Sequence, residues 1–351
     1  ADALGRAGYR SMLVCKWHLG AHPNFHPLKR GFNEFFGFLG GGHQYFPSAL
    51  EILDPLSVDD EGSSYKTKLN RGLAVVEEQE YITDAFSREA VSFVDRNRNN
   101  PFFLYLTYNA PHSPLQAPDQ YLSRFKHIAD SKRRTYAAMV SAIDDGVGKL
   151  LDKLKETGQD KNTLLFFLSD NGGPLDNGSS NHPLTGKKGN LYEGGIRVPF
   201  AMQWPGVIPA GTVYEKPIIS LDIFATALGS LQKTVVTKNP LEGVNLIPYL
   251  TGKKKGAPHE ILFWRNQDMK AYAAINADGK KLWMKGDTTF LFDLGKSGAE
   301  KQNIANENPE LVIRMKKQVA EWDKGLKPPA FLGLSQRDEY IRLRNKANQP
   351  Q

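Results

Sequence analysis

The chain has 351 residues, of which 40% are hydrophobic and 11% aromatic, so it can bury a sizeable core and is too apolar for a disordered protein. A single cysteine, Cys15, excludes an internal disulfide framework and a zinc site with several cysteines. The formal net charge of +7 favours anionic partners.

Sequence patterns narrow the class of partner further. Nucleic acid and sulfated or phosphorylated small molecules and glycans fit the charge equally well. No aromatic-basic RNA motif, zinc finger or heptad zipper occurs, so we expect no nucleic-acid partner. No apolar run reaches the roughly 18 residues of a membrane span, and we expect no membrane partner. The opening residues, ADALGRAGYRSMLV, do not resemble a signal peptide and are typical of a helix interior. We therefore expect the chain to be the body of a longer protein.

Three apolar, strand-like runs lead directly into polar residues. These are YRSMLV before Cys15, Lys16, Trp17 and His18, PFFLYLTYNAP before His112, and NTLLFFLS before Asp170 and Asn171. Continuous apolar runs of this kind are typical of parallel strands that are covered on both faces.

Two amphipathic helices are predicted between these strands. The first, TDAFSREAVSFVDRNR, begins with Thr83 or Asp84 as its N-cap and ends in basic residues. The second starts at Ser131, places apolar residues on one face and stops at Gly158. The alternation predicts an α/β fold with a mainly parallel central sheet sandwiched by helices. Ligands bind such sheets beyond the carboxyl ends of the strands, where all three polar clusters fall.

The rest of the chain divides at about residue 240. A fourth strand, IRVPFAMQWPG, contains Pro199 and is expected at an edge or bulge, while residues 53–70 are expected to form a surface loop. After Leu241, the runs EILFWRN, AYAAINA, KKLWMKG and TFLFDL predict short antiparallel strands, followed by an amphipathic helix, PELVIRMKKQVAEWDKGL. We expect an α/β domain over 1–240 and a smaller subdomain over 241–351, with a loosely docked polar tail from Ser335.

Lysines and a histidine near the strand ends are candidate anion ligands. Alternate residues after a strand point to the same side, so Lys16 and His18 can address one anion, as a positive charge and as a proton carrier. Lys187 and Lys188 lie in a glycine-rich loop that can approach an oxyanion closely. Taken singly, each pair is explained better as solvated loop residues.

The other candidates are His112 and an Asp-Asn pair. A lone histidine between two prolines, as in NAPHSPLQAP, is more often structural than catalytic. Asp170 and Asn171 offer oxygen ligands for Ca²⁺ or Mg²⁺, although Asp-Asn-Gly-Gly is also good turn chemistry and Ca²⁺ takes about six to eight oxygens. Together with Lys16, His18 and Lys188, these residues predict a metal-assisted site for a tetrahedral anion.

Five blocks of sequence, in order from about Ala1 to Asp293, carry a family resemblance. They are GYRSMLVCKWHLG, RGFNEFFGF, PFFLYLTYNAPHSPLQAP, LSDNGGP and KKGNLYEGGIRVPFAMQWPGVIPAG. They resemble the type I sulfatases of the alkaline phosphatase superfamily. Lys16 and Lys188 of this chain resemble the lysines that bind the sulfate oxygens in that family. His112 resembles the histidine on the leaving-group side of the sulfate, and His18 the one that hydrogen-bonds the hydrated formylglycine and helps collapse the hemiacetal sulfate.

The resemblance also defines what the chain lacks. Asp170 and Asn171 resemble two of the four protein ligands of Ca²⁺ (Mg²⁺ in some members), and the N-terminal Asp-Asp pair that completes the set is missing. The motif C/S-x-P/A-x-R, from which the formylglycine nucleophile is made, does not occur. Cys15 stands where the family usually has glycine, without the proline and arginine needed for modification, and we expect a small buried residue. The absence of a central strand is expected to expose a sheet edge and favour aggregation or oligomerisation.

The sequence therefore predicts a sulfuric ester hydrolase acting on a sulfated carbohydrate, with little or no formylglycine-dependent activity of this chain alone. A phosphodiesterase or phosphonate hydrolase, and a non-catalytic sulfated-glycan binder, stay open as alternatives. His43, Gln44 and Tyr45 are candidate substrate contacts, because an aromatic beside polar groups suits a sugar ring; a loop packing its own aromatics explains them equally well. Family analogy suggests a periplasmic or secreted enzyme.

Overall fold

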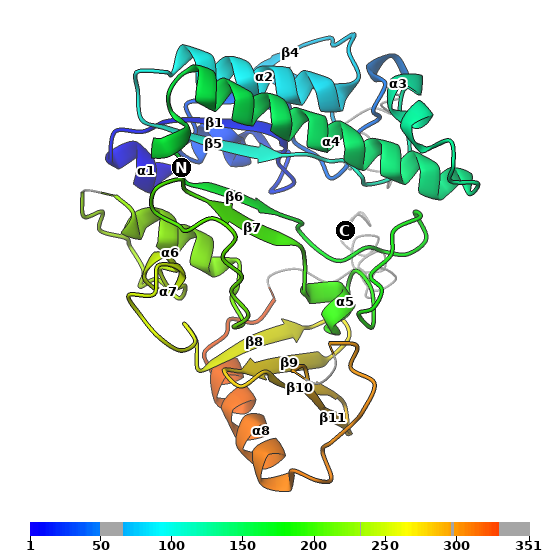
Figure 1. The fold of residues 1–351 in the computed structure, drawn as a ribbon, viewed down its shortest axis with the longest axis vertical. Helices are drawn as coiled ribbons and strands as arrows, with labels where there is room; N and C mark the ends of the chain where they lie inside the picture. Colours follow the sequence, from blue (N-terminus) through cyan, green and yellow to red (C-terminus); the bar gives the residue numbers. More distant parts are fainter. Residues whose placement is uncertain (50–65, 232, 296–297, 330–351) are drawn as a thin grey trace, which may run out of the picture.

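A computed structural model of the chain describes residues 1–49, 66–231, 233–295 and 298–329. The polar stretch 53–70 therefore lies mostly outside the described residues, and the tail from Ser335 entirely so. Figure 1 shows three layers along the long axis: two long helices over a five-stranded sheet, a two-stranded sheet in the middle, and an antiparallel sheet with one helix below.

The helices and strands have the following bounds. The helices are α1 (Asp2–Arg6), α2 (Ile82–Arg96), α3 (Asp119–Leu122), α4 (Ser131–Glu156), α5 (Glu193–Ile196), α6 (Leu221–Gly229), α7 (Ile247–Leu250) and α8 (Pro309–Lys324). The strands are β1 (Arg10–Lys16), β2 (Glu34–Phe38), β3 (Asn70–Arg71), β4 (Ala74–Val75), β5 (Phe102–Thr107), β6 (Leu165–Leu168), β7 (Phe200–Gln203), β8 (Ile261–Asn266), β9 (Ala271–Asn276), β10 (Lys280–Lys285) and β11 (Thr288–Asp293).

The five-stranded sheet has the order β4-β3-β2-β1-β5 and is parallel at its centre. β1 pairs in parallel with β2 on one side and with β5 on the other, while β3 and β4 add antiparallel pairs. Met12, Leu13 and Val14 of β1 are buried, as a strand covered on both faces requires. The expected α/β class, with a mainly parallel central sheet and a separate C-terminal antiparallel sheet, is confirmed. β2 was not expected as a strand, although its residues belong to the block RGFNEFFGF.

β6 departs from the expected arrangement. The run NTLLFFLS does form a strand, but β6 pairs antiparallel with β7 in a separate two-stranded sheet. Pro199 directly precedes β7 and lies outside it. Within the described part of the chain, β5 and β6 each have a strand partner on one side only. Tyr105 of β5 and Phe167 of β6 are 46% and 44% exposed. The exposed sheet edge that the sequence predicts is therefore found at both strands.

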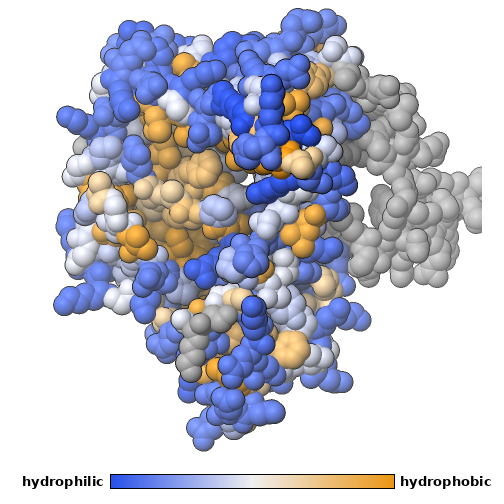
Figure 2. Space-filling model, turned by 45° about the vertical axis from the view of Figure 1, so that its right-hand side comes forward, coloured by the Kyte–Doolittle hydropathy of each residue, from blue (hydrophilic) through white to orange (hydrophobic). Residues whose placement is uncertain are grey.

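A cavity of about 3330 Å³ is bordered by β5 and β6. Side chains of α4, β5, β6 and α6 line much of it, among them the apolar residues Val140, Phe167 and Phe224. Figure 2 shows a broad apolar surface in a hollow on one face of the molecule. Ligand pockets measure about 300–1,000 Å³, so this cavity is too large for a small ligand alone. Lys16 and Asp170 are among the charged residues that line it.

The two long helices stack on the central sheet, α2 against the strands and α4 against α2. The N-cap predicted for the first was wrong: α2 begins at Ile82, so Thr83 and Asp84 lie inside its first turn. Asp84 instead accepts a hydrogen bond from the hydroxyl of Tyr121 at 2.6 Å. In α4, the carboxylate of Asp130 caps the N-terminus. The helix ends before Gly158 at φ +72°, as expected.

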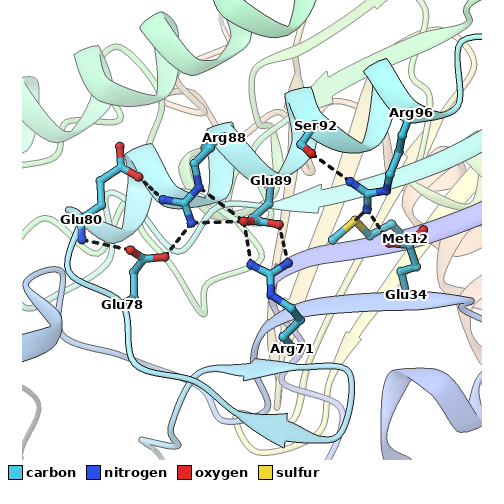
Figure 3. Close-up of polar contacts among 9 residues, drawn as sticks. All are labelled: Met12, Glu34, Arg71, Glu78, Glu80, Arg88, Glu89, Ser92 and Arg96. Atoms are coloured by element: carbon cyan, nitrogen blue, oxygen red, sulfur yellow. Dashed lines mark hydrogen bonds and ion pairs between the residues drawn. The ribbon is translucent and has the colours of Figure 1, made fainter.

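An ion-pair network fastens the β3–β4 hairpin to α2 (Figure 3). Glu89 of α2 accepts hydrogen bonds from both terminal nitrogens of Arg71, at 2.7 and 2.8 Å. Arg88 reaches from the same helix to Glu78 at 2.7 Å and to Glu80, in the segment before α2. Burial opposes the charge on Glu89, yet the hydrogen bonds from Arg71 and Arg88 hold the pKa of this carboxyl below its usual value. The network therefore ties three consecutive segments together.

The C-terminal sheet has the order β11-β10-β9-β8 and is antiparallel throughout, so the four predicted strands and the predicted helix are confirmed. Met315 and Val319 of α8 pack against Leu282 and Leu291 of the sheet. A second cluster joins the sheet to the segment around Leu191. Among the described residues, no helix is long and apolar enough to cross a membrane.

Candidate active site

Main-chain hydrogen bonds fix the residues that follow β1. The hydroxyl of Thr107, at the end of β5, donates to the carbonyl of Lys16 at 2.6 Å. The amide of Trp17 donates to Phe38 at 3.0 Å, and that of His18 to Leu39 at 3.2 Å. The segment is therefore held from both neighbouring strands, and its side chains have a defined place at the carboxyl end of the sheet.

The charges of five candidate residues act on one another. Burial lowers the pKa of Lys16, which Asp170 opposes and Lys188 reinforces. Burial also lowers the pKa of His18, and so do Lys16, His112 and Lys188, again against Asp170. Such effects weaken with distance and screening, so these groups lie close together. All five, and Asn171, line the same cavity.

His112 is held through its backbone and its ring. Its carbonyl accepts a hydrogen bond from the hydroxyl of Tyr45 at 2.8 Å, and its amide donates to Asn109 at 2.9 Å. Nδ1 lies 2.8 Å from the carbonyl of Ser113. A carbonyl can only accept, so Nδ1 carries the proton in this contact and Nε2 is the basic nitrogen of the neutral ring.

The turn with Asp170 and Asn171 packs against α5. The amide of Gly172 donates to the carbonyl of Gly195 at 3.1 Å. A Cβ atom on Gly172 would lie 1.8 Å from the carbonyl oxygen of Gly194, so only glycine fits. Gly172 is thus required by close packing of two chain segments as well as by the turn.

The loop that carries Lys188 is closed onto the same turn. The amide of Lys188 donates to the carbonyl of Gly173 at 3.1 Å, and that of Gly194 to Thr185 at 2.6 Å. Lys187, by contrast, does not line the cavity, and its amide donates to the side-chain oxygen of Asn190 at 3.2 Å. Of the two neighbouring lysines, Lys188 is therefore the one placed at the site.

The Asp-Asn pair fits a hard cation in donor type. A carboxylate and a carboxamide supply the oxygen atoms that Ca²⁺ and Mg²⁺ prefer. In the part of the chain that the structure describes, no group of three or more His, Cys, Asp or Glu side chains is arranged to hold a metal ion. Ca²⁺ takes about six to eight oxygens, so Asp170 and Asn171 provide only part of such a site.

Three candidate substrate contacts lie away from the cavity. His43 and Tyr45 are only 1% and 0% exposed, and neither they nor Gln44 line it. His43 packs on the ring of Phe38, with centroids 5.2 Å apart, so the loop packs its own aromatic residues. The structure does not bring these three side chains into the site. Sequence reasoning also missed the support that Tyr45 gives to His112, because nothing in the sequence links positions so far apart.

Cys15 is buried, as expected, and has φ +90°, a backbone conformation that glycine adopts far more easily. Its thiol lies 3.5 Å from the side-chain oxygen of Asn109, and burial raises its pKa well above the usual range. A nucleophilic cysteine needs a lowered pKa and access to solvent, and Cys15 has neither.

Comparison with known proteins agrees with the sequence blocks. The sulfatase family model matches residues 1–233. The chain belongs to the sulfatase family. It is 33% identical over 314 residues to the N-acetylgalactosamine-6-sulfatase of Mus musculus, covering 87% of this chain and 58% of that protein. It is 34% identical over 285 residues to the uncharacterized sulfatase YdeN of Escherichia coli (strain K12). That match covers 73% of this chain and 47% of YdeN. This sulfatase chain thus spans about half the length of these relatives.

Solved structures share the fold of this chain. The crystal structure of Ps i-CgsB in complex with k-i-k-neocarrahexaose matches with a TM-score of 0.86 and 35% identity, over 99% of this chain and 80% of that one. The phosphonate monoester hydrolase of Agrobacterium radiobacter shares the fold, with a TM-score of 0.61 and 17% identity over 91% and 78% of the two chains. The resemblance to sulfatases is confirmed.

Proposed function

We propose that this chain forms the anion-binding part of a sulfatase that hydrolyses a sulfate ester of a carbohydrate. The observation that carries the proposal is that Lys16, His18, His112, Lys188 and Asp170 line one cavity and that their charges interact. A similar protein named for N-acetylgalactosamine 6-sulfate, and another crystallised with a neocarrahexaose, support a sugar substrate. On this proposal the fold divides into a sulfatase domain over 1–240 and a subdomain over 241–351, in a periplasmic or secreted protein.

Each residue has a distinct part in binding and proton transfer. The ammonium groups of Lys16 and Lys188 bind the sulfate oxygens and stabilise the negative charge that develops on them. A charge-assisted hydrogen bond contributes about 1.5–3 kcal/mol. Nε2 of His112 lies on the side of the departing oxygen and can give it a proton once the ring is protonated. The lowered pKa of His18 keeps its ring neutral near pH 7, so it can accept a proton.

A cation and a nucleophile complete this chemistry. Asp170 and Asn171 would hold Ca²⁺, or alternatively Mg²⁺, which would add positive charge at the sulfate oxygens. The family's nucleophile, formylglycine, needs a motif that this sequence does not contain. We therefore expect little or no formylglycine-dependent turnover by this chain alone, and measurable binding of the sulfated sugar.

The binding test compares two neighbouring lysines. We expect Lys16→Ala and Lys188→Ala to weaken the binding of a sulfated oligosaccharide at least about tenfold, since each removes a charged contact. Lys187→Ala is the matched control, because it removes the same charge from the same loop without touching the cavity. Isothermal titration calorimetry measures all three. Equal affinities for the Lys187 and Lys188 variants would contradict the proposed site.

Turnover separates the remaining alternatives. A phosphodiesterase or phosphonate hydrolase is the second candidate, because one such hydrolase shares the fold. Rates of hydrolysis of matched sulfate, phosphate and phosphonate esters decide between them, measured on this chain and on this chain extended by a segment that carries the nucleophile motif. A sulfated-glycan binder would show lysine-dependent affinity and no turnover in any form. Rapid metal-dependent sulfate release by the 351 residues alone would demand a nucleophile outside the expected motif.

A further inference from the structure

A buried ion cluster connects the C-terminal sheet to the site loop. Lys281 of β10 is 0% exposed, and its Nζ lies 2.8 Å from Oε1 of Glu193 and 2.8 Å from Oε1 of Glu300. The contact with Glu193 is a hydrogen bond, whereas that with Glu300 is an ion pair without hydrogen-bond geometry. Oε2 of Glu300 accepts a hydrogen bond from the amide of Glu193 at 2.7 Å. Lys281 does not line the cavity.

Such a cluster adds little to the stability of the fold, but it fixes the positions of its side chains relative to one another. Three charged groups lose their hydration on burial, so apolar residues of the same volume would stabilise the fold as well or better. What the cluster does achieve is to set Glu193, the first residue of α5, at one position relative to β10. An error in that position would leave a charge buried without its partner.

The residues next to Glu193 contact both halves of the candidate site. Gly194 donates from its amide to Thr185 in the Lys188 loop, and Gly195 accepts from Gly172 beside the Asp-Asn pair. A Cβ atom on Gly195 would lie 2.2 Å from the carbonyl oxygen of Asn190, so the loop and α5 are closely packed. A shift of Glu193 would therefore move the sulfate-binding loop and the cation ligands together.

Two further contacts attach the loop to the same sheet. The rings of Tyr192 and Trp283 stack with centroids 4.9 Å apart. The side-chain amide of Asn266 donates to the carbonyl of Gly189 at 2.9 Å. The loop is thus supported on the C-terminal side of Lys188 by residues of β8 and β10.

We propose that Lys281 is a positioning residue of the sulfatase site: by binding Glu193 and Glu300 it holds the Lys188 loop and the Asp170–Asn171 turn at the geometry that sulfate binding requires. The proposal rests on the proposed function for its second half only, since the loop can be positioned whether or not sulfate is the ligand. The C-terminal sheet is then part of the active-site framework.

Limited trypsinolysis of the 351-residue chain tests the positioning directly. In Lys281→Met, we expect cleavage after Lys187 and Lys188 to rise about tenfold, because cleavage follows the population of the open loop. Cleavage after Arg88, in the interior of α2, is the internal reference for global unfolding, because trypsin cuts there only when the helix opens, and mass spectrometry resolves the two sites. Lys280→Met is the matched control, because this neighbour forms a more exposed pair with Asp293 at 2.8 Å.

Binding of inorganic sulfate, measured by calorimetry, tests the consequence for the site. We expect Lys281→Met to lower the affinity for sulfate about fivefold or more, and Lys280→Met to leave this affinity unchanged. Lys281→Arg keeps the charge, so its loop cleavage and its sulfate affinity should lie between those of the wild type and of Lys281→Met. If Lys281→Met does not fold, Lys281→Arg alone tests the proposal. Wild-type cleavage of the loop in both Lys281 variants would overturn the proposal. If the wild type binds no sulfate while the loop still opens, the proposed function fails and the positioning of the loop stands.

Discussion

The hydroxyl of Tyr45 donates a hydrogen bond to the main-chain carbonyl of His112 at 2.8 Å, across 67 positions of sequence. Tyr45 is fully buried, and its amide donates a hydrogen bond to the side-chain oxygen of Gln116 at 2.8 Å. The tyrosine that the sequence suggests as a sugar contact therefore supports the backbone of the site histidine.

Tyr45→Phe removes this hydrogen bond and keeps the ring. We expect it to lower the free energy of unfolding by about 0.5–1.5 kcal/mol, the net value of one hydrogen bond. It should also weaken sulfated-oligosaccharide binding, because His112 loses an anchor. Tyr81→Phe is the control, because the hydroxyl of Tyr81 donates to the main-chain carbonyl of Gln116 at 2.9 Å in the same core. Urea unfolding and calorimetry measure the two effects, and equal binding by both variants would argue against a link to His112.

The charge environment of His18 predicts a pH dependence. Burial and the positive groups Lys16, His112 and Lys188 lower its pKa below the ordinary value of about 6.5. The unfolded state therefore binds the proton more tightly, and the stability contributed by neutral His18 is present above pH 6.5 and lost as the pH falls through the lowered pKa. NMR titration of the ring should give a midpoint below 6.5, and Lys16→Ala should raise it. An unchanged midpoint in that variant, with Lys29→Ala as control, would show that the two groups do not interact.

Glu89 predicts a second loss of stability at acid pH, in the same direction as that of His18. Its lowered pKa means that the stability it contributes is present above the unfolded value and lost as the pH falls through the folded one. Glu89→Gln should cost about 1–3 kcal/mol at pH 7, because it weakens hydrogen bonds to two arginines at a buried position. Glu80→Gln, at a side chain that is 42% exposed, should cost less than about 0.5 kcal/mol. Chemical unfolding at pH 7 and at acid pH measures the difference, which should shrink on acidification.

Local periodicity predicted most elements, because strand runs, amphipathic faces and turn residues act within a few positions. β1, β5, α4 and the whole C-terminal sheet follow from such patterns. The partner of β6 could not be found in this way, since an apolar run does not reveal whether its neighbour is parallel or antiparallel. The N-cap of α2 was misplaced because Asp84, a good capping residue, bonds instead to Tyr121 from a distant helix.

The candidate site shows the same division. Lys16, His18, His112, Asp170, Asn171 and Lys188 all follow strand ends or glycine turns, and the structure brings them to one cavity. His43 and Tyr45 sit in an equally polar, glycine-rich stretch but turn inward, because Phe38 and Tyr81 offer them aromatic partners. The cluster of Lys281 was invisible for a different reason. Lys281 and Glu300 lie 88 and 107 positions from Glu193 in the sequence, and only the fold brings them together.

The unpaired edges of β5 and β6 predict how this chain behaves in solution. Strand edges beside exposed apolar side chains pair with other chains, so we expect association that grows with protein concentration, and binding of a hydrophobic dye. Phe167→Lys places a charge at the edge of β6, where the side chain is 44% exposed, and should shift the chain toward monomer. Ile313→Lys is the control, at a 68% exposed position of α8, which packs on the C-terminal sheet. Light scattering after size exclusion measures the mass of each. A monomeric wild type that binds no dye would mean that the two edges are covered, and an equal shift in both variants would mean that association uses charge in general and not this edge.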